Sequence, residues 1–310
     1  MPAYHVSRSI IINKPLEKIR ESLIDYRQWP VWSPWLIMEP ESKLTYSTNQ
    51  SVVGAGYDWE GELTGKGSMK LLNIADHKLD MGLQFIKPLK STAKVTFELE
   101  ELRKNVTKLT WNMYSKLPFF LFWMVNKVKT YIGMDFERGL KMLKDFLESG
   151  AVPSAVKIKG VGKLKQQQYI GIKNQSRIGD IGKVMPDSFI KLKILMQENG
   201  LSNECLPFAI YETFDIQKDE TRFISAIPVD KAMPVSAPFI QGELTESDIL
   251  KVLHTGRYEH LGNAWSTAMA YARSKKIKTT NTPIGIEFYL NDPTEVPEQD
   301  LLTEVVLPLR

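Results

Sequence analysis

The stretch Pro207-Phe208-Ala209-Ile210-Tyr211 decides the organisation of the C-terminal half, because the chain repeats it with small changes. The second version is Pro283-Ile284-Gly285-Ile286-Glu287-Phe288-Tyr289, which begins 76 residues later (283 minus 207). Residues 225–229 and 305–309 form another similar pair, with prolines 80 residues apart (308 minus 228). Two such offsets predict an internal repeat of roughly 80 residues, with a short insertion in the second copy between residues 291 and 301.

The hydrophobic pattern of each copy predicts the order strand, helix, strand, strand. These elements are expected at residues 166–173, 180–199, 207–214 and 221–228 in the first copy, and at 247–254, 259–275, 284–290 and 302–308 in the second. Two such units related by a pseudo-two-fold axis would set two sheets side by side. A crevice would lie between the two sheets. Ligands tend to bind in crevices where repeats meet.

The N-terminal half has a different pattern, with alternating strands between two helices. Residues 6–12 read as a strand, and Asn13 and Pro15 open a helix that we expect to stop at Pro30. Apolar and polar residues then alternate in the runs 57–59, 81–85, 95–99 and 109–113, and from about Asn126 the period becomes that of a long helix ending near Gly150. The sequence therefore predicts an α+β fold in which the long helix covers the concave face of an antiparallel sheet and leaves a cavity.

Six of the seven tryptophans lie in this half, and Trp59 and Trp111 belong to strands whose apolar and polar residues alternate between the two faces. They are either ordinary core residues or the walls of an apolar pocket for a hydrophobic guest. Three segments resemble the polyketide cyclase branch of the START-related helix-grip (SRPBCC) superfamily: Trp29-Pro30-Val31-Trp32-Ser33-Pro34-Trp35, Gly54-Ala55-Gly56-Tyr57-Asp58-Trp59-Glu60-Gly61 and Asp135-Phe136-Glu137-Arg138-Gly139-Leu140. This resemblance covers residues 3–149 and implies a helix-grip fold around a hydrophobic cavity.

After a linker at residues 150–155, residues 156–310 resemble the GyrI-like, AraC-type effector-binding family. The resemblance rests on Thr255-Gly256-Arg257-Tyr258-Glu259-His260-Leu261, Tyr289-Leu290-Asn291-Asp292-Pro293 and Leu302-Thr303-Glu304-Val305-Val306-Leu307-Pro308-Leu309. It implies a domain of two pseudo-symmetric repeats that binds cationic or amphipathic organic molecules with aromatic walls and a buried carboxylate. Some members resemble hydrolases in which a Tyr and a Glu open strained rings.

Glu304 is the residue that we expect to supply the buried carboxylate of this binding site. Its apolar neighbours indicate a buried strand, where an unpaired ionised Glu costs several kcal/mol unless a ligand cation or a hydroxyl is near. Desolvation would then raise its pKa. The alternative is an exposed Glu at the end of a strand.

Aromatic residues of the same half are the other candidates for this binding site. Tyr258 could take part in proton transfer with Glu304 if the protein is an enzyme, and otherwise would bind the ligand. The alternative is that such tyrosines are core residues whose ring is buried and whose hydroxyl contacts solvent. The expected ligand-binding set is completed by Tyr289, Tyr169, Tyr211 and Trp265.

Several classes of function are disfavoured by composition. The 40 basic and 36 acidic residues leave a formal charge of +4, too mild for direct nucleic-acid binding. The single cysteine, Cys205, excludes an intramolecular disulfide. His254 and His260 flank a turn without further metal ligands, and Lys159-Gly160-Val161-Gly162-Lys163 reads as a flexible linker rather than a phosphate loop. We expect no metal and no cofactor.

The chain has no apolar run that would act as a signal peptide, so we expect a cytoplasmic protein. Nine basic and two acidic residues occur between Arg103 and Lys144, around the apolar run 117–125. A peripheral membrane contact is one interpretation of this stretch. We favour a solvated helix face beside a hydrophobic gate or core segment.

Together these features predict a small-molecule sensor, carrier or sequestering protein. Its N-terminal cavity would be apolar, and its C-terminal cleft would take amphipathic or cationic ligands. The alternative is a hydrolase of electrophilic small molecules that uses Glu304 and a Tyr. No DNA-recognition helix pair is found before the effector-binding half, so direct DNA binding is not expected.

Overall fold

The computed structural model describes residues 2–201 and 206–310, so Cys205 lies outside the described residues. The chain divides into two compact units, Met1–Pro153 and Ser154–Arg310. Each unit contains one antiparallel sheet, and the described residues include six α-helices in total. The predicted α+β class is therefore confirmed.

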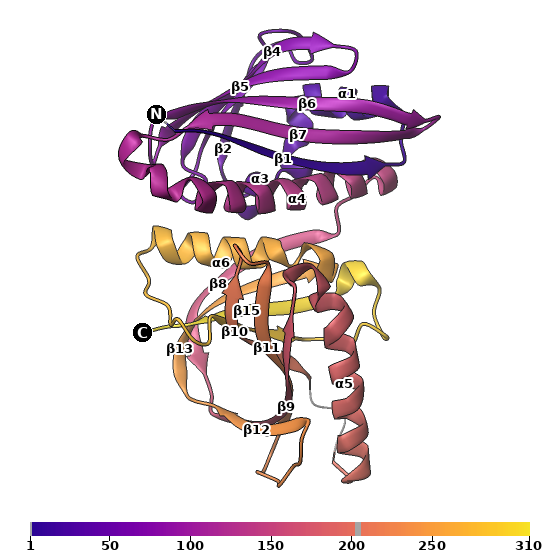
Figure 1. The fold of residues 1–310 in the computed structure, drawn as a ribbon, viewed down its shortest axis with the longest axis vertical. Helices are drawn as coiled ribbons and strands as arrows, with labels where there is room; N and C mark the ends of the chain where they lie inside the picture. The colour runs from indigo at the N-terminus through magenta and orange to yellow at the C-terminus, as the bar shows by residue number, and fades with distance from the viewer. Residues whose placement is uncertain (1, 202–205) are drawn as a thin grey trace. The chain divides into compact units, whose positions relative to one another are not determined.

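The N-terminal unit is built on a seven-stranded sheet with the order β1-β7-β6-β5-β4-β3-β2 (Figure 1). Its strands are β1 (Ala3–Ile12), β2 (Lys43–Tyr46), β3 (Gly56–Glu60), β4 (Lys66–Ala75), β5 (Lys78–Lys87), β6 (Ser91–Arg103) and β7 (Val106–Lys116). The predicted alternation is confirmed in β6, where Val95, Phe97 and Leu99 are buried and Lys94 and Glu98 are exposed. This period of two gives the sheet one apolar face.

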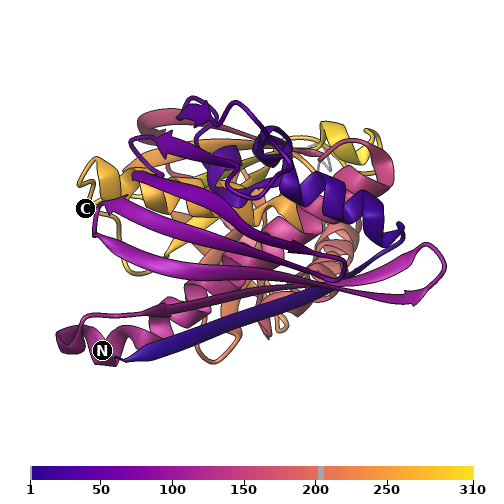
Figure 2. The same ribbon diagram turned by 90° about the horizontal axis from the view of Figure 1, so that it is seen from above.

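The helix α4 (Val125–Ser149) packs along that apolar face (Figures 1 and 2). Phe136 of α4 stacks on Trp111 of β7, with ring centroids 4.2 Å apart and planes within 9°. The helix ends where predicted, because Gly150 adopts a left-handed conformation (φ 85°) that an L side chain would strain.

The short helices before β2 differ from the prediction that Pro30 stops a single helix. The first helix, α1 (Leu16–Ile24), already ends at Asp25, whose carboxylate accepts a hydrogen bond from the Arg27 backbone N–H and begins the turn η1 (Tyr26–Gln28). Pro30 then lies in the first turn of α2 (Trp29–Trp32), which is followed by α3 (Pro34–Met38). Proline is tolerated there because the N–H groups of a first turn have no partner within the helix.

The C-terminal unit contains one continuous sheet of eight strands, with the order β12-β9-β11-β10-β14-β15-β13-β8. The strands are β8 (Ser154–Leu164), β9 (Gln167–Ser176), β10 (Phe208–Asp215), β11 (Glu220–Val229), β12 (Phe239–Leu244), β13 (Ser247–Gly256), β14 (Gly285–Tyr289) and β15 (Leu302–Pro308). Exchanging β8 to β11 for β12 to β15 reverses this order, as a two-fold axis requires. Ile210 pairs with Ile286, its equivalent in the other copy at the offset of 76 (286 minus 210).

Two predictions about this unit are wrong. The repeats do not form two separate sheets with a crevice between them, because the backbone hydrogen bonds between β10 and β14 join them into one. Residues 159–163 are not a flexible linker, since they lie in β8, and residues 160–163 pair with β13. Each repeat therefore has an additional edge strand, β8 or β12, which pairs with a strand of the other repeat.

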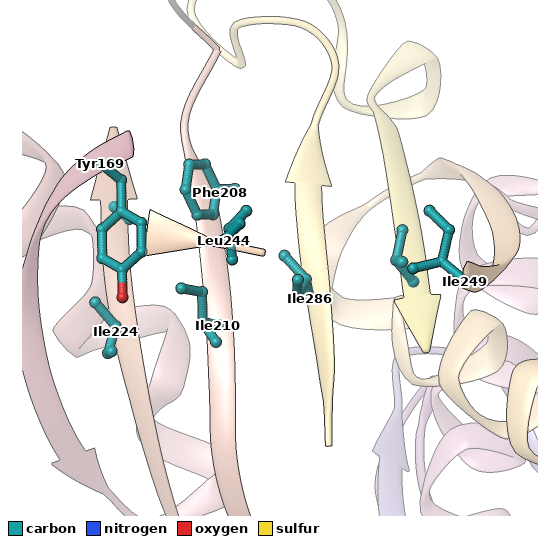
Figure 3. Packing of buried hydrophobic residues seen from close by; sticks show 9 residues of the cluster. Tyr169, Phe208, Ile210, Ile224, Leu244, Ile249 and Ile286 are labelled. Carbon is teal, nitrogen blue, oxygen red and sulfur yellow. The ribbon is translucent and has the colours of Figure 1, made fainter. Parts of the chain in front are cut away.

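The two faces of this sheet are both apolar but have different neighbours. One face carries Tyr169, Phe208, Ile210, Ile286 and Val306, which pack together across four strands (Figure 3). The opposite face is covered by α5 (Ile181–Glu198) and α6 (Gly262–Ser274), which pack on alternate residues of the same strands. The candidate site lies on this second face.

Candidate functional site

Glu287, in the middle of β14, is a buried carboxylate on the helix-covered face of the sheet. Its Oε1 accepts a hydrogen bond from Trp265 Nε1 on α6 at 2.5 Å. Its Oε2 accepts hydrogen bonds from the hydroxyls of Tyr211 at 2.9 Å and Tyr289 at 2.7 Å. The Tyr289 hydroxyl also lies 3.0 Å from Met185 Sδ on α5, but its single proton serves the carboxylate, the stronger acceptor. Trp265 of α6, Tyr211 of β10 and Tyr289 of β14 thus bind the Glu287 carboxylate directly.

The carboxylate has neutral hydrogen-bond donors but no counter-charge. Among the described residues, none of the ion pairs includes Glu287. Burial raises the pKa of Glu287, and the hydrogen bonds from Trp265, Tyr289 and Tyr211 oppose part of that effect. An ionised carboxylate in this position is costly unless a positive charge is brought to it. The site is therefore suited to a cation.

The side of the cluster nearest to solvent is marked by Tyr258, which is 37% exposed. Its ring packs edge-on against Tyr289, with centroids 5.6 Å apart. Burial and the negative charges of Asp292 and Glu287 raise the pKa of Tyr258 to about 12. Of these two carboxylates, Asp292 already pairs with Lys193, whose Nζ lies 3.3 Å from Asp292 Oδ2.

Three of the predicted ligand-binding residues are hydrogen-bonded to Glu287: Tyr211, Tyr289 and Trp265. A fourth, Tyr258, packs against the ring of Tyr289. The other two C-terminal candidates lie on the opposite face. Tyr169 packs edge-on against Phe208, with ring centroids 5.6 Å apart. Glu304 lies opposite Phe288 in the register of β14 and β15, so it shares the face of Val306 in that cluster.

The expectation of an unpaired Glu304 in a dry cleft does not match its surroundings. Lys251 Nζ lies 3.2 Å from Glu304 Oε2, and the Glu304 side chain is 19% exposed. Within the described part of the chain, no tyrosine hydroxyl is hydrogen-bonded to it. The partner of the Glu304 charge is therefore a lysine of the neighbouring strand.

The sequence did contain a signal for Glu287. It is the single acid within the apolar stretch 284–289, and the offset of 76 aligns it with Tyr211 (287 minus 211). The two repeat-equivalent side chains are hydrogen-bonded to each other across the two-fold axis. An acid in one copy that replaces a tyrosine in the other marks a position that the repeat fold does not itself require.

Stability should depend on pH through Glu287. A carboxyl whose pKa is raised in the folded state stabilises the fold below its ordinary pKa, and this contribution is lost as pH rises through the folded value. We therefore expect the free energy of unfolding of Glu287→Gln, relative to wild type, to increase as pH is raised above about 4.5, the unperturbed value. Urea unfolding of both proteins across a pH series measures this difference, and parallel curves would contradict it.

A second buried group, His254 on β13, should make the stability of the fold depend on pH in the opposite direction. Its side chain is inaccessible to solvent, and its Nε2 is 3.0 Å from the Ser154 hydroxyl. Burial, aided by the charge of His260, lowers the pKa of His254 from 6.5 to about 4. The neutral form is thus the one that the fold accepts.

His254 should make the fold sensitive to acid. The shift of about 2.5 pH units (6.5 minus 4) corresponds to about 3 kcal/mol of stability, present above pH 6.5 and lost as pH falls toward 4. The variant His254→Asn should lack this loss, so its free energy of unfolding should change less between pH 7 and pH 4. If urea unfolding gave the same pH dependence for both proteins, His254 would not be the responsible group.

In the N-terminal unit, the predicted wall residues Trp59 and Trp111 are both buried in an aromatic cluster. Trp111 contacts the rings of Trp29, Trp32, Trp35, Phe97 and Phe136. Trp59 packs against Phe85 and donates its Nε1–H to the backbone oxygen of Thr64 at 3.2 Å. These neighbours are those of core residues, which is the first of the two interpretations of the tryptophans.

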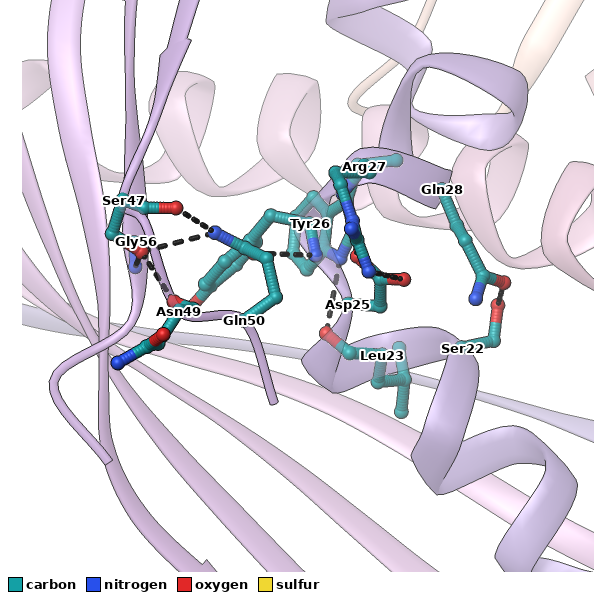
Figure 4. Close-up of polar contacts among 11 residues, drawn as sticks. Ser22, Leu23, Asp25, Tyr26, Arg27, Gln28, Ser47, Asn49, Gln50 and Gly56 are labelled. Atoms are coloured by element: carbon teal, nitrogen blue, oxygen red, sulfur yellow. Dashed lines mark hydrogen bonds and ion pairs between the residues drawn. The ribbon is translucent and has the colours of Figure 1, made fainter. Parts of the chain in front are cut away.

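Four polar atoms within or next to this cluster lack a hydrogen-bond partner among the described residues: Tyr26 Oη, Trp32 Nε1, Ser33 Oγ and Trp111 Nε1. The backbone of Tyr26, in contrast, has a hydrogen-bond partner. The Tyr26 N–H donates to Gln50 Oε1, and the Gln50 side-chain amide donates in turn to Ser47 (Figure 4). All four unpaired groups can donate a hydrogen bond. Buried donors of this kind normally have a partner, so their presence here requires an explanation.

Comparison with known proteins gives a family match within the C-terminal unit. Residues 161–310 match the model of the GyrI-like small molecule binding domain family. No curated protein matches the chain. The matched range does not include the N-terminal unit, so its relation to the SRPBCC superfamily stays a prediction.

Three similar solved structures illustrate how distant the relatives are. The EcmrR–DNA complex has a TM-score of 0.43 and 14% identity, covering 60% of this chain and 65% of that one. The EcmrR C-terminal domain has a TM-score of 0.39 and 16% identity over 51% and 96% of the two chains. A protein from Chromobacterium violaceum has a TM-score of 0.36 and 14% identity over 46% and 96%. At these TM-scores, the similarity carries no functional inference.

Proposed function

We propose that the C-terminal unit, whose residues 161–310 match the GyrI-like small molecule binding domain family, binds an organic cation whose charge is neutralised by Glu287. The observation that carries the proposal is the buried carboxylate with three neutral donors and no basic partner among the described residues. A cation removes the cost of burying this charge, and a neutral ligand does not. Binding of the cation would therefore offset the cost of burying the ionised Glu287 carboxylate.

The surrounding rings define the shape of the ligand. Tyr211 and Trp265 pack edge-on at 5.3 Å between centroids, and Phe189 packs edge-on against Tyr289 at 5.8 Å. Aromatic faces attract cations with a delocalised or shielded charge more than compact ammonium ions, which lose more hydration. The preferred class is therefore a lipophilic cation with aromatic or bulky apolar groups, admitted beside Tyr258.

The N-terminal unit is proposed to bind a second, mainly apolar guest within a helix-grip fold, as the resemblance to the SRPBCC superfamily implies. The four unpaired donors support a guest that carries an acceptor oxygen, such as a carbonyl. Sensing, carrying or sequestering such molecules are the roles that fit two binding units in one chain.

A direct experiment compares two probes of similar shape and different charge, tetraphenylphosphonium and the neutral triphenylphosphine oxide. Isothermal titration of the full chain should give binding of the cation that is at least about tenfold tighter than binding of the neutral probe. Equal affinities, or no binding of either, would remove the support for a cation site. Native mass spectrometry of the purified chain would separately identify a guest of the N-terminal unit.

The alternative hydrolase with Glu304 and a tyrosine is less well supported, since Lys251 rather than a tyrosine is the partner of Glu304. The expectation of no direct nucleic-acid binding stays a prediction. A gel-shift titration with duplex DNA at low salt tests it.

A further inference from the structure

The segment between β7 and α4 exposes four large aromatic side chains together. They belong to the turn η2 (Phe119–Met124), none of whose residues is buried. The exposed fractions are 76% for Phe119, 73% for Phe120, 62% for Phe122 and 66% for Trp123. We call these four residues the aromatic tip. Isolated exposed apolar residues are ordinary, but four adjacent rings form a patch that requires a partner.

The sequence led us to favour a gate or core position for this segment, and its exposure excludes the core. In the N-terminal unit, η2 projects beyond the end of the sheet, next to the N-terminus (Figures 1 and 2). The connection between β5 and β6 lies at the same end, because Ala93 of β6 pairs with Ser115 near the end of β7. That connection includes Leu89, which is 68% exposed.

Positive charge surrounds the aromatic tip. From Lys104 to Met134 the chain contains five lysines and no Asp or Glu. Three of them, Lys116, Lys127 and Lys129, are exposed and immediately flank η2. The β5–β6 connection adds the exposed Lys87 and Lys90. In the described part of the chain, none of these five flanking lysines forms an ion pair.

We propose that the aromatic tip inserts into the interface of an anionic lipid bilayer, with Lys116, Lys127 and Lys129 contacting the lipid headgroups. Phe and Trp side chains partition into the boundary between headgroups and acyl chains, and nearby lysines gain from the negative surface potential. Lysines at the edge of an inserted segment can also extend their amines back to the headgroups. The patch combines the two interactions that stable peripheral binding requires.

A bilayer fits this surface better than a protein partner. A stable protein interface needs about 800 Å², or roughly 20–30 residues, from each partner, whereas η2 has six residues. Insertion into lipid requires no complementary shape. No helix of the described residues is long and apolar enough to span a membrane.

The test uses the full chain and vesicles of phosphatidylcholine with or without about 30% phosphatidylserine. The chain should sediment with the anionic vesicles and not with the neutral ones, and raising NaCl to about 0.5 M should weaken binding roughly tenfold or more. Sedimentation with neither kind of vesicle, or equally with both, would overturn the proposal.

Variants separate the tip from other exposed apolar residues. Phe120→Ser with Phe122→Ser should weaken binding to anionic vesicles at least about tenfold. Val53→Ser with Ile190→Ser changes two residues that are 61% and 58% exposed elsewhere, and should bind like wild type. The charge reversals Lys127→Glu and Lys129→Glu together should abolish binding. A tip variant that binds like wild type would contradict the assignment.

Brominated lipids give the position of the tip directly, because they quench only tryptophans that enter the bilayer. Trp123 is the one tryptophan among the strongly exposed residues, so its quenching should account for the signal. Trp123→Phe should keep vesicle binding and lose the quenching. Undiminished quenching in this variant would place another surface in the membrane. If native mass spectrometry instead showed a dimer that Phe120→Ser and Phe122→Ser dissociate, without vesicle binding, the partner would be a second copy and the proposal would fail.

Discussion

Glu287→Gln is expected to weaken the binding of tetraphenylphosphonium roughly a thousandfold, or about 4 kcal/mol, as for the loss of one partner of a buried ion pair. The substitution keeps the size of the side chain and one of the two oxygens that accept hydrogen bonds from Trp265 and the two tyrosines. It removes the negative charge and replaces the other oxygen with an NH2 group, which can donate to a tyrosine hydroxyl. Isothermal titration at neutral pH measures the change.

The matched control is Glu304→Gln, which makes the same chemical change on the other face of the sheet. Because Lys251 already pairs with Glu304, this variant should bind the cation within about twofold of wild type. If Glu304→Gln lost most of its affinity for the cation and Glu287→Gln did not, the binding carboxylate would be Glu304, as the sequence first indicated.

Phe136→Ala should be the most destabilising change in the N-terminal unit, by about 4 kcal/mol, as is typical of Phe to Ala substitutions in a core. Phe136 is 1% exposed and stacks on Trp111, which itself contacts four further rings. The cavity left by the ring would lie between α4 and the sheet, and large neighbouring indoles cannot easily fill it. Urea unfolding followed by tryptophan fluorescence should report the loss, since most tryptophans are in this cluster.

Tyr131→Ala provides a comparison on the same helix, where the side chain is 47% exposed. Its effect should stay within about 0.5 kcal/mol, as is usual for surface substitutions. Equal effects of the two variants would mean that α4 does not rely on its contact with Trp111.

The fold could be predicted to the extent that periodicity determines it. The elements of each repeat agree with those predicted to within a few residues, for example α5 at Ile181–Glu198 against 180–199. The edge strands β8 and β12 were missed, since edge strands carry charges and glycines that also occur in linkers. Every second residue of β8 is exposed, and three of these five residues are lysines: Lys157, Lys159 and Lys163.

The site could be predicted only in part, because strand register cannot be read from composition. Glu287 and Glu304 are both acids within apolar strands. The pairing of Phe288 with Glu304 places the two acids on opposite faces of the sheet. Only the first faces the helices that supply Trp265 and Met185. Three of the aromatic residues that the sequence singled out are hydrogen-bonded to Glu287, whereas Glu304 pairs with Lys251. Ligand binding at either carboxylate stays a prediction.

The most direct test of the account is the titration of the Glu287 carboxyl carbon by NMR, with the resonance assigned from its absence in Glu287→Gln. In the free protein, burial raises the pKa of this group. Saturation with tetraphenylphosphonium should lower the midpoint by at least about one pH unit, since a nearby cation favours the charged form. A midpoint that the bound cation leaves unchanged would contradict the claim that Glu287 neutralises the ligand.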